Sequence, residues 1–272
     1  MASFSVVNNI ASVNAQARLY ETNVGLQRTL GRLSSGLRIN QSADDAAGLA
    51  VANKFRSDIA ILNVGVRNAN DAISRLQIID GATNNISQLL DRAAVLATQA
   101  ASEGNEGLNR TVLNDEFQKV LAEIDREAGV AKLNVTTNFT VYVSSEATQS
   151  DGTIHVSFSN QATASALGVT AATTNISTVA AAQSAITALS AAISTLGTLQ
   201  GAVGSAQNRL QFAVSLANSQ IVNKSAAESR LRDANIAEES ANLTRYNILT
   251  QSGLASLAQA NQTTASVLSL LR

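Results

Sequence analysis

The stretch LSSGLRINQSADDAAGLAV, residues 33–51, separates two long helical patterns and decides how the chain is divided. Gly36 is placed to take the left-handed conformation that ends a helix. Ser42 is expected to cap the following helix, with Asp45 at the third helical position of a capping box. Asp44 and Asp45 then lie where the helix dipole favours negative charge. The stretch therefore predicts a helix end followed by a capped helix start.

Apolar residues recur at alternating spacings of three and four on both sides of this connector. After it, the rhythm runs from Leu62 to Leu96, which corresponds to roughly 50 Å of helix. A period near 3.5 residues indicates long helices that pack as coiled coils. Before the connector, the same stripe consists of Ile10, Val13, Ala17, Tyr20, Val24, Gln27, Leu30 and Leu33.

The middle of the chain changes its period. Residues 113–124 carry one apolar face that includes Phe117 and should fold back against the second helix. Between about residues 134 and 169 the apolar period becomes two, with an Asp151-Gly152 turn between two strand-like runs. This pattern predicts a β-hairpin. Helical spacing returns near Ala180 and predicts a helix that pairs with the second one.

The last stretch, residues 236–272, ends in an apolar run, although chain ends are usually frayed and polar. Two terminal helices that paired only with each other would leave long apolar stripes uncovered, and such stripes mark an interface. We therefore expect the stripes to be buried in an assembly. The residues expected to pack there are Ile10, Val13, Leu30, Leu33, Leu257, Val267, Leu268, Leu270 and Leu271.

The composition limits the possible functions. The 272 residues include no Cys, Trp or Pro, and only 3% of them are aromatic. The formal net charge is −1. A core of small and aliphatic side chains favours long helices with narrow seams, and no basic patch is available for nucleic acid. Neither a secretory signal nor an apolar run of about 18 residues is found, which favours a cytoplasmic protein or export without cleavage. Arg38 is interpreted as a solvated charge or as a bridge to carboxylates of a neighbour.

An enzyme is not expected. His155 is the single histidine and lies in a strand-like stretch without a metal-binding, phosphate-binding or nucleophile motif. Adjacent carboxylates such as Asp44 and Asp45 point about 100° apart on a helix and do not face each other. The same holds for the pairs at residues 115–116 and 238–239. We expect no catalytic residues, no metal and no cofactor.

Two stretches resemble the hallmarks of a known family. LSSGLRINQSADDAAGLAVANKF, residues 33–55, strongly resembles the N-terminal hallmark of bacterial flagellins. SGLASLAQANQ, residues 252–262, followed by VLSLL, residues 267–271, resembles their C-terminal hallmark. Departures occur at Val6-Val7-Asn8-Asn9 and at Thr263-Thr264-Ala265. Because only about 40 residues separate the helical halves, the chain resembles a short flagellin without outer variable domains.

The resemblance implies a fold, a function and partners. The fold is expected to be mainly α, with long coiled-coil helices from both chain ends packed as a rod and a small β-hairpin region at about 134–169. The expected division is a terminal-helix core domain of residues 1–42 and 223–272 and a rod domain of residues 43–222. The resemblance further implies a secreted subunit that leaves the cell unfolded through type III export and polymerises into the flagellar filament for motility. Its implied partners are its own copies, an export chaperone, the filament cap and hook-junction proteins.

Two other classes of protein remain as alternatives. A secreted coiled-coil translocator or adhesin would use similar helices without forming a filament. An amphipathic membrane binder would need a polar face rich in Lys and Arg, whereas the terminal helices are dominated by Ser, Asn, Gln and Ala.

The resemblance also implies contact with the animal innate immune receptor for flagellin. The matching positions are Arg92 and Leu96 on the second helix and Glu116 on the third. The spacing of four residues puts Arg92 and Leu96 on one helix face. Leu96 also continues the heptad stripe, so core packing is its alternative, and Arg92 is alternatively an ordinary solvated charge.

Overall fold

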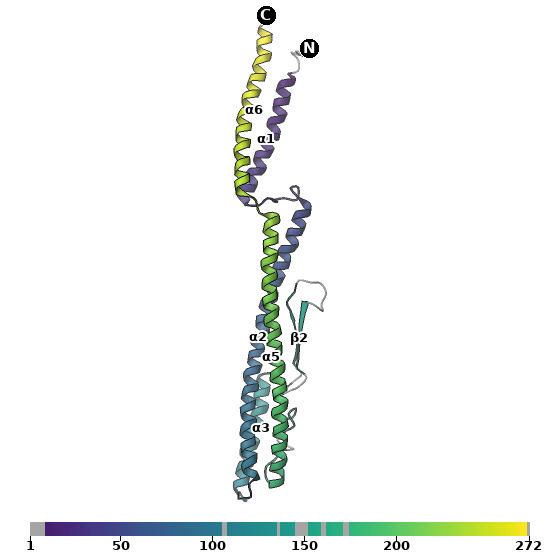
Figure 1. Ribbon diagram of the computed structural model, residues 1–272, viewed down its shortest axis with the longest axis vertical. Helices are drawn as coiled ribbons and strands as arrows, with labels where there is room; N and C mark the ends of the chain where they lie inside the picture. The colour runs from purple at the N-terminus through teal and green to yellow at the C-terminus, as the bar shows by residue number, and fades with distance from the viewer. Residues whose placement is uncertain are drawn as a thin grey trace. The chain divides into compact units, whose positions relative to one another are not determined.

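The computed structural model describes residues 9–104, 108–134, 137–144, 152–158, 162–170 and 174–270, without the side chains of Leu108, Thr137 and residues 264–270. The fold is mainly helical, as expected, with a small two-stranded sheet in mid-chain (Figure 1). The elements are α1 (Ile10–Ser35), α2 (Ala46–Ala101), α3 (Leu108–Val130), β1 (Thr137–Tyr142), β2 (Thr153–Phe158), α5 (Val179–Arg232) and α6 (Ile236–Leu270).

The chain forms two compact units. The terminal unit comprises the segments up to Ser57 and from Asn223 onward, and the central unit comprises Asp58–Val222. Residues 43–57 thus group with the terminal segments, whereas the resemblance predicts them in the rod domain. The packing of the first turns of α2 explains this grouping, because Ala52 is fully buried and a Cβ on Gly48 would lie 2.8 Å from Ile39 Cδ1. The functional domain division itself stays a prediction.

The end of α1 confirms the predicted helix stop. Gly36 has φ 72°, the left-handed conformation, and its N–H donates to the Arg32 carbonyl at 2.8 Å. At the other end of α1, the Asn9 side chain accepts a hydrogen bond from the Ser12 N–H. Both ends of the helix therefore have local caps for their free main-chain groups.

The predicted capping box at Ser42 is wrong. The helix α2 begins at Ala46, and Asp45 is its cap, because Asp45 Oδ1 accepts from the Gly48 N–H at 2.9 Å. Asp44 Oδ2 instead accepts from the main-chain N–H groups of Asn40 and Gln41, both at 3.2 Å. Asp44 thereby closes a turn that includes Ser42, and this turn delays the start of the helix by three residues. The carboxylates of Asp44 and Asp45 thus each accept hydrogen bonds from nearby main-chain N–H groups.

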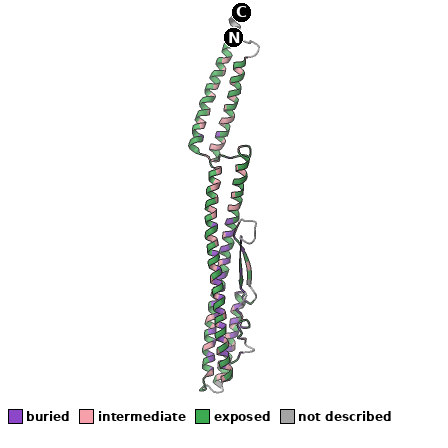
Figure 2. Cartoon of the chain, turned by 45° about the vertical axis from the view of Figure 1, so that its right-hand side comes forward, coloured by how far each residue is buried: buried purple, intermediate pink, exposed green. Residues whose placement is uncertain are grey.

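The central unit has one hydrophobic core. The helices α2, α3 and α5 each contribute one buried stripe to it, and Figure 2 shows buried residues along all three. The largest fully buried side chains are Phe117, Leu62, Leu76, Ile86, Leu90, Leu96, Leu121, Ile124, Leu133, Ile176, Leu189 and Leu196. The predicted apolar faces of the second and third helices and of the helix after residue 180 are confirmed by this packing.

The predicted β-hairpin is also confirmed. Strand β1 pairs antiparallel with β2, and Val141 lies opposite Ile154 in the register. Val141, Val156 and Phe158 are nearly fully buried against the helical core. Asp151 of the predicted turn lies outside the described residues. Alternation of apolar and polar residues thus gave the correct strands and the correct buried face.

Polar side chains of α3 hold the segment that leads into α5. Asn114 accepts from the Ile176 N–H, Gln118 donates to the Thr174 carbonyl, and Asp125 accepts from the Ala164 N–H, at 2.8–3.0 Å. Within this segment Ala162, Ala164, Val169 and Ile176 are fully buried. The segment therefore adds a further layer to the central core.

By length and composition alone, α5 is the one described helix that could cross a membrane. Its buried residues, from Ala182 to Ala217, instead pack into the same core as α2 and α3. The buried part of its apolar composition is therefore used in the core of the central unit.

Candidate functional site: the paired terminal helices

The helices α1 and α6 form an antiparallel pair. Near one end, Arg32 Nη1 donates to Glu239 Oε1 at 3.1 Å, and at the other end Asn9 Nδ2 donates to the Ala260 carbonyl at 2.8 Å. Partner numbers fall along α1 as they rise along α6, which defines the antiparallel direction. Four α6 residues that contact α1 or its N-cap Asn9 are spaced seven residues apart, as in a coiled-coil seam: Glu239, Tyr246, Gly253 and Ala260.

Two glycines allow the pair to approach closely. A Cβ on Gly25 would lie 2.6 Å from ring atoms of Tyr246, so the Tyr246 ring lies directly on the α1 backbone. In the reverse direction, a Cβ on Gly253 would lie 3.1 Å from Leu19 Cδ1. Each helix thus provides one large side chain and one glycine. The seam includes these two contacts, the Arg32–Glu239 ion pair and the amide hydrogen bond of Asn9.

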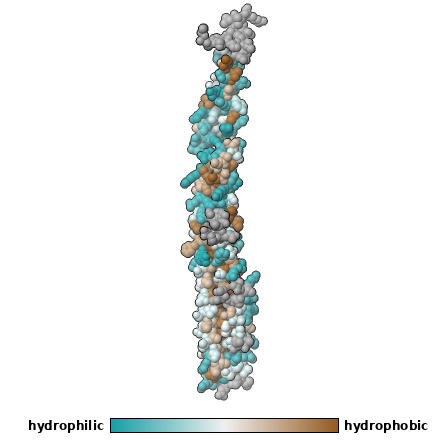
Figure 3. All heavy atoms as spheres, turned by 90° about the vertical axis from the view of Figure 1, so that its right-hand side faces the viewer, coloured by the Kyte–Doolittle hydropathy of each residue, from teal (hydrophilic) through white to brown (hydrophobic). Residues whose placement is uncertain are grey.

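The helices α1 and α6, unlike the helices of a packed core, leave their described hydrophobic side chains exposed or only half-buried. Among their described side chains, only Thr29 and Glu239 are buried, and Figure 2 shows both helices as exposed or intermediate almost throughout. In the space-filling view, hydrophobic residues reach the surface among hydrophilic ones (Figure 3). The large hydrophobic residues exposed on these helices are Ile10, Val13, Tyr20, Leu30, Ile236, Ile248, Leu249 and Leu254.

The residues predicted to pack in an assembly lie on this pair where they are described. Ile10, Val13 and Leu30 are 63%, 62% and 47% exposed. Leu33 and Leu257 are half-buried. The side chains of Val267, Leu268 and Leu270, and the whole of Leu271, lie outside the described residues. The described members therefore have apolar surface that the single chain does not bury.

The two connectors of the terminal unit are hydrogen-bonded to each other. Leu37 and Asp233 form a β-bridge, and the Ala234 N–H donates to the Gly36 carbonyl at 2.9 Å. Arg38 donates from its main chain to the Arg232 carbonyl at 2.6 Å and from Nη2 to the Leu231 carbonyl at 2.7 Å. Arg38 is exposed, as a solvated charge would be, but its guanidinium is hydrogen-bonded to a main-chain carbonyl, and among the described residues it forms no ion pair with a carboxylate. Arg38 links the two connectors by hydrogen bonds. This role could not be predicted from the sequence, because the sequence does not show that the two connectors lie in contact.

The predicted receptor residues divide into a surface pair and a core residue. Arg92 Nε donates to Glu116 Oε1 at 3.1 Å, with the two side chains 52% and 44% exposed. Leu96 is only 1% exposed and belongs to the hydrophobic core. The structure thus brings Arg92 and Glu116 together and places Leu96 away from the surface.

A second exposed ion network lies on α3. Arg126 donates to Glu123 Oε1 at 2.6 Å and also contacts Glu127. The hydrogen bond from Arg126 lowers the pKa of Glu123 below its ordinary value, and the same bond raises the pKa of Arg126. Because Arg126 and Glu123 are largely exposed to solvent, their ion pair contributes little to folding.

The candidate acid–base residues have structural roles. The exposed His155 ring is hydrogen-bonded to the Thr140 hydroxyl at 2.9 Å, across the two strands. Glu239 pairs with Arg32, and Glu116 pairs with Arg92. Within the described part of the chain, His, Asp and Glu residues form no group of three that could hold a metal ion.

An antiparallel pair of terminal helices that leaves large hydrophobic side chains exposed is typical of a structural protein that assembles with other chains. Comparisons with known proteins identify the family. Residues 6–139 match the bacterial flagellin N-terminal helical region, and residues 179–271 match the bacterial flagellin C-terminal helical region. The chain belongs to the bacterial flagellin family.

The relatives match over nearly their whole length. The flagellar filament 33 kDa core protein of Treponema phagedenis is 37% identical, covering 97% of this chain and 99% of the relative. Flagellins of Halalkalibacterium halodurans and Bacillus subtilis are 36% and 33% identical, each covering 97% of this chain and 98% and 99% of the relative. A crystal structure of Bacillus cereus flagellin, 29% identical, covers 60% of this chain and 94% of that chain with a TM-score of 0.47.

Family membership gives the function at a coarse level. Flagellins are structural, non-enzymatic subunits of the flagellar filament and serve motility. The chain is therefore exported to the flagellum and polymerises with copies of itself.

Proposed function

We propose that the outward apolar faces of α1 and α6 are the surface through which this flagellin polymerises, and that they become the buried core of an open helical filament. One observation carries the proposal: among the described side chains of the two helices, not one hydrophobic side chain is buried within the single chain.

The energetics favour burial between subunits. Fully burying a Val, Leu or Ile side chain contributes about 1.5–3 kcal/mol, and several such side chains on α1 and α6 remain exposed. A pair of helices that leaves this contribution unused is marginally stable alone, because most helix stability comes from packing of the apolar face. Contact with neighbouring subunits supplies the missing layer.

The seam between α1 and α6 supports the same proposal. Its ion pair, glycine contacts and amide hydrogen bond set the register of the pair without using the exposed aliphatic side chains such as Ile10, Val13 and Leu254. Those side chains stay available for other copies. A surface that binds a different surface on the next copy continues from subunit to subunit, and it produces an open helix where the rotation between subunits does not close a ring.

Further partners follow from the resemblance alone. We propose an export chaperone, the filament cap and hook-junction proteins as partners of the terminal helices. Contact with the animal innate immune receptor is also proposed, and the exposed Arg92–Glu116 pair supports it. The burial of Leu96 argues against a direct contact by that residue in this conformation.

Substitution of the outward face tests the proposed polymerisation surface. Ile10→Asp with Val13→Asp is expected to abolish filament formation, because two carboxylates would have to be desolvated between subunits. The central unit should keep its helical circular dichroism signal, since neither residue belongs to its core. Filaments are measured by sedimentation and negative-stain electron microscopy.

The matched control adds the same charge to α1 without removing an apolar side chain. Gln16→Asp with Asn23→Asp changes two exposed polar positions of the helix and should leave the filament yield near that of the wild type. A normal yield from the Ile10 and Val13 variant would exclude the outward face of α1 as a polymerisation surface.

A further inference from the structure

Phe212 on α5 has the most exposed large hydrophobic side chain in the described part of the chain, at 77%. The chain contains only six phenylalanines and no tryptophan. The other described phenylalanines are buried or half-buried: Phe55, Phe117, Phe139 and Phe158. A phenylalanine can bury 150–250 Å² of surface, but Phe212 contributes almost none of that burial to the folding of its own chain.

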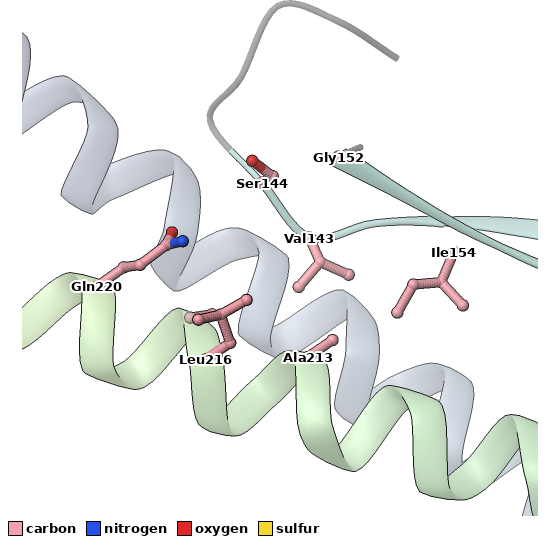
Figure 4. A pocket seen from close by; sticks show the side chains of 8 residues that line it. Val143, Ser144, Gly152, Ile154, Ala213, Leu216 and Gln220 are labelled. Atoms are coloured by element: carbon pink, nitrogen blue, oxygen red, sulfur yellow. The ribbon is translucent and has the colours of Figure 1, made fainter. Parts of the chain in front are cut away.

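The surroundings of Phe212 extend it into an apolar patch. Leu216 lies one turn further along α5 and is 60% exposed. Beside Leu216 is a hollow of about 100 Å³, lined by side chains of both α5 and the hairpin. Figure 4 shows Val143 and Ile154 pointing from the hairpin toward the helices, with Ala213 and Leu216 on the α5 side. We call Phe212, Leu216 and this hollow the Phe212 patch.

The patch lies in an uncharged part of α5. The sequence has no Asp, Glu, Lys or Arg between Arg209 and Lys224. Depletion of charged residues with an exposed aromatic residue is typical of the core of a protein interface. An uncharged surface also avoids like-charge repulsion between identical molecules, which approach each other in any homopolymer.

We propose that the Phe212 patch docks against a second copy of this chain in the filament. A second copy is the partner that the chemistry favours, because the chain polymerises with itself and the patch carries apolar area and no charge. The proposal relies on polymerisation of the chain and extends the proposed function to the central unit. It does not require that α1 and α6 form the other contact.

A cysteine beside Phe212 tests whether the patch is covered. The chain has no native cysteine, so Ser215→Cys places a single thiol on the exposed side of α5, three residues from Phe212. In the monomer a maleimide reagent should react rapidly. In the filament the reaction should be at least about 10-fold slower, because the interface core excludes water and reagent. Equal rates in monomer and filament, or a thiol already protected in the monomer, would overturn the proposal.

A charge substitution tests whether the patch contributes to assembly. Phe212→Asp should raise the subunit concentration needed for polymerisation by at least about 10-fold, which is the effect of losing roughly 1.4 kcal/mol at an interface anchor. Its melting temperature should stay unchanged, because Phe212 is exposed in the monomer. Val112→Asp, at a 66% exposed position of α3, is the control and should polymerise normally. Normal polymerisation of Phe212→Asp would overturn the proposal.

The two proposals fail in different ways. If Ile10→Asp with Val13→Asp blocks assembly while the thiol at position 215 reacts equally in monomer and filament, only the role of the Phe212 patch is excluded. If the thiol is protected in filaments and the Ile10 and Val13 variant assembles normally, the terminal-helix surface is excluded and the Phe212 patch stands.

Discussion

The central and terminal units are both built from long α-helices with heptad-like apolar spacing, yet they use that spacing differently. In the central unit, α2, α3 and α5 bury residues such as Leu76, Phe117 and Leu189 almost completely. In the terminal unit, the described parts of α1 and α6 bury only Thr29 and Glu239. The same sequence pattern therefore marks an internal core in one unit and an open surface in the other.

The number of packing layers explains the difference. The central unit supplies a third helix, a hairpin and the segment of residues 162–170 to cover its long helices. The helices α1 and α6 have only each other, and two helices can enclose a narrow seam but not a thick core. In that seam a glycine of each helix faces one large side chain of the other, Gly25 against Tyr246 and Gly253 against Leu19. We infer that the missing layer of the terminal unit is provided by other subunits.

Amide hydrogen exchange should show the largest difference between the two units. In the monomer, amides of α1 and α6 should exchange with opening free energies near 0, while core amides of α2, α3 and α5 should approach the global unfolding free energy of the central unit. In the filament, protection of α1 and α6 should rise to the level of the central unit. Mass spectrometry of peptides from both states measures the change. Equal protection of the terminal helices in the two states would mean that they fold without a neighbour.

A pair of Phe→Ala substitutions compares internal packing with exposed surface. Phe117→Ala should destabilise the central unit by about 3–5 kcal/mol, because it removes a fully buried aromatic side chain and leaves a cavity. Phe212→Ala should change the monomer by less than about 0.5 kcal/mol, as expected for an exposed position. Urea denaturation followed by circular dichroism gives both values. Similar losses from the two variants would contradict the assignment of Phe212 to the surface of the monomer.

Much of this fold could be predicted from the sequence. The 3.5-residue spacing predicted the long helices, and the period of two predicted the hairpin. Gly36 predicted the end of α1. These predictions were correct because each depends on a local pattern of residues. The helix start at Asp45 was missed, since Ser42, Asp44 and Asp45 are all acceptable caps and only the main-chain path shows which carboxylate faces which N–H. Asp44 accepts from the N–H groups of Asn40 and Gln41, so its carboxylate closes the turn before α2.

The site was predictable in part. The outward stripe of α1 was visible in the sequence, but periodicity alone does not tell whether a stripe is covered by the same chain or by another. Leu96 illustrates this limit, because its helical position fitted both a receptor contact and the core. Arg38 could not be assigned because its acceptor, the Leu231 carbonyl, lies 193 residues away in the chain. Phe212 was overlooked because a single exposed aromatic residue has no periodic signal.

The smallest expected effect comes from substituting two glycines of α2 that differ in what an added Cβ would contact. A Cβ on Gly65 would lie 2.5 Å from the Val143 carbonyl oxygen of the hairpin, whereas nothing lies within 4 Å of a Cβ on Gly81. Replacing a helical glycine by alanine stabilises a helix by roughly 0.5–1 kcal/mol. Gly81→Ala should show this gain in full. Gly65→Ala should instead lose about 1–3 kcal/mol, because the added methyl group forces the hairpin backbone away from α2.

The two variants share the same substitution in the same helix, so the helix-propensity term cancels in their difference. What remains is the cost of separating the hairpin from α2, measured as the difference in urea midpoint of the central unit. Opposite signs would show that the hairpin backbone at Val143, directly after β1, lies on the backbone of α2 and that the hairpin belongs to the layer that α1 and α6 lack within one chain. Equal stabilisation by both variants would show that the hairpin can move away from Gly65 at little cost, and the contrast between the two units would then depend on α3 and the segment of residues 162–170 alone.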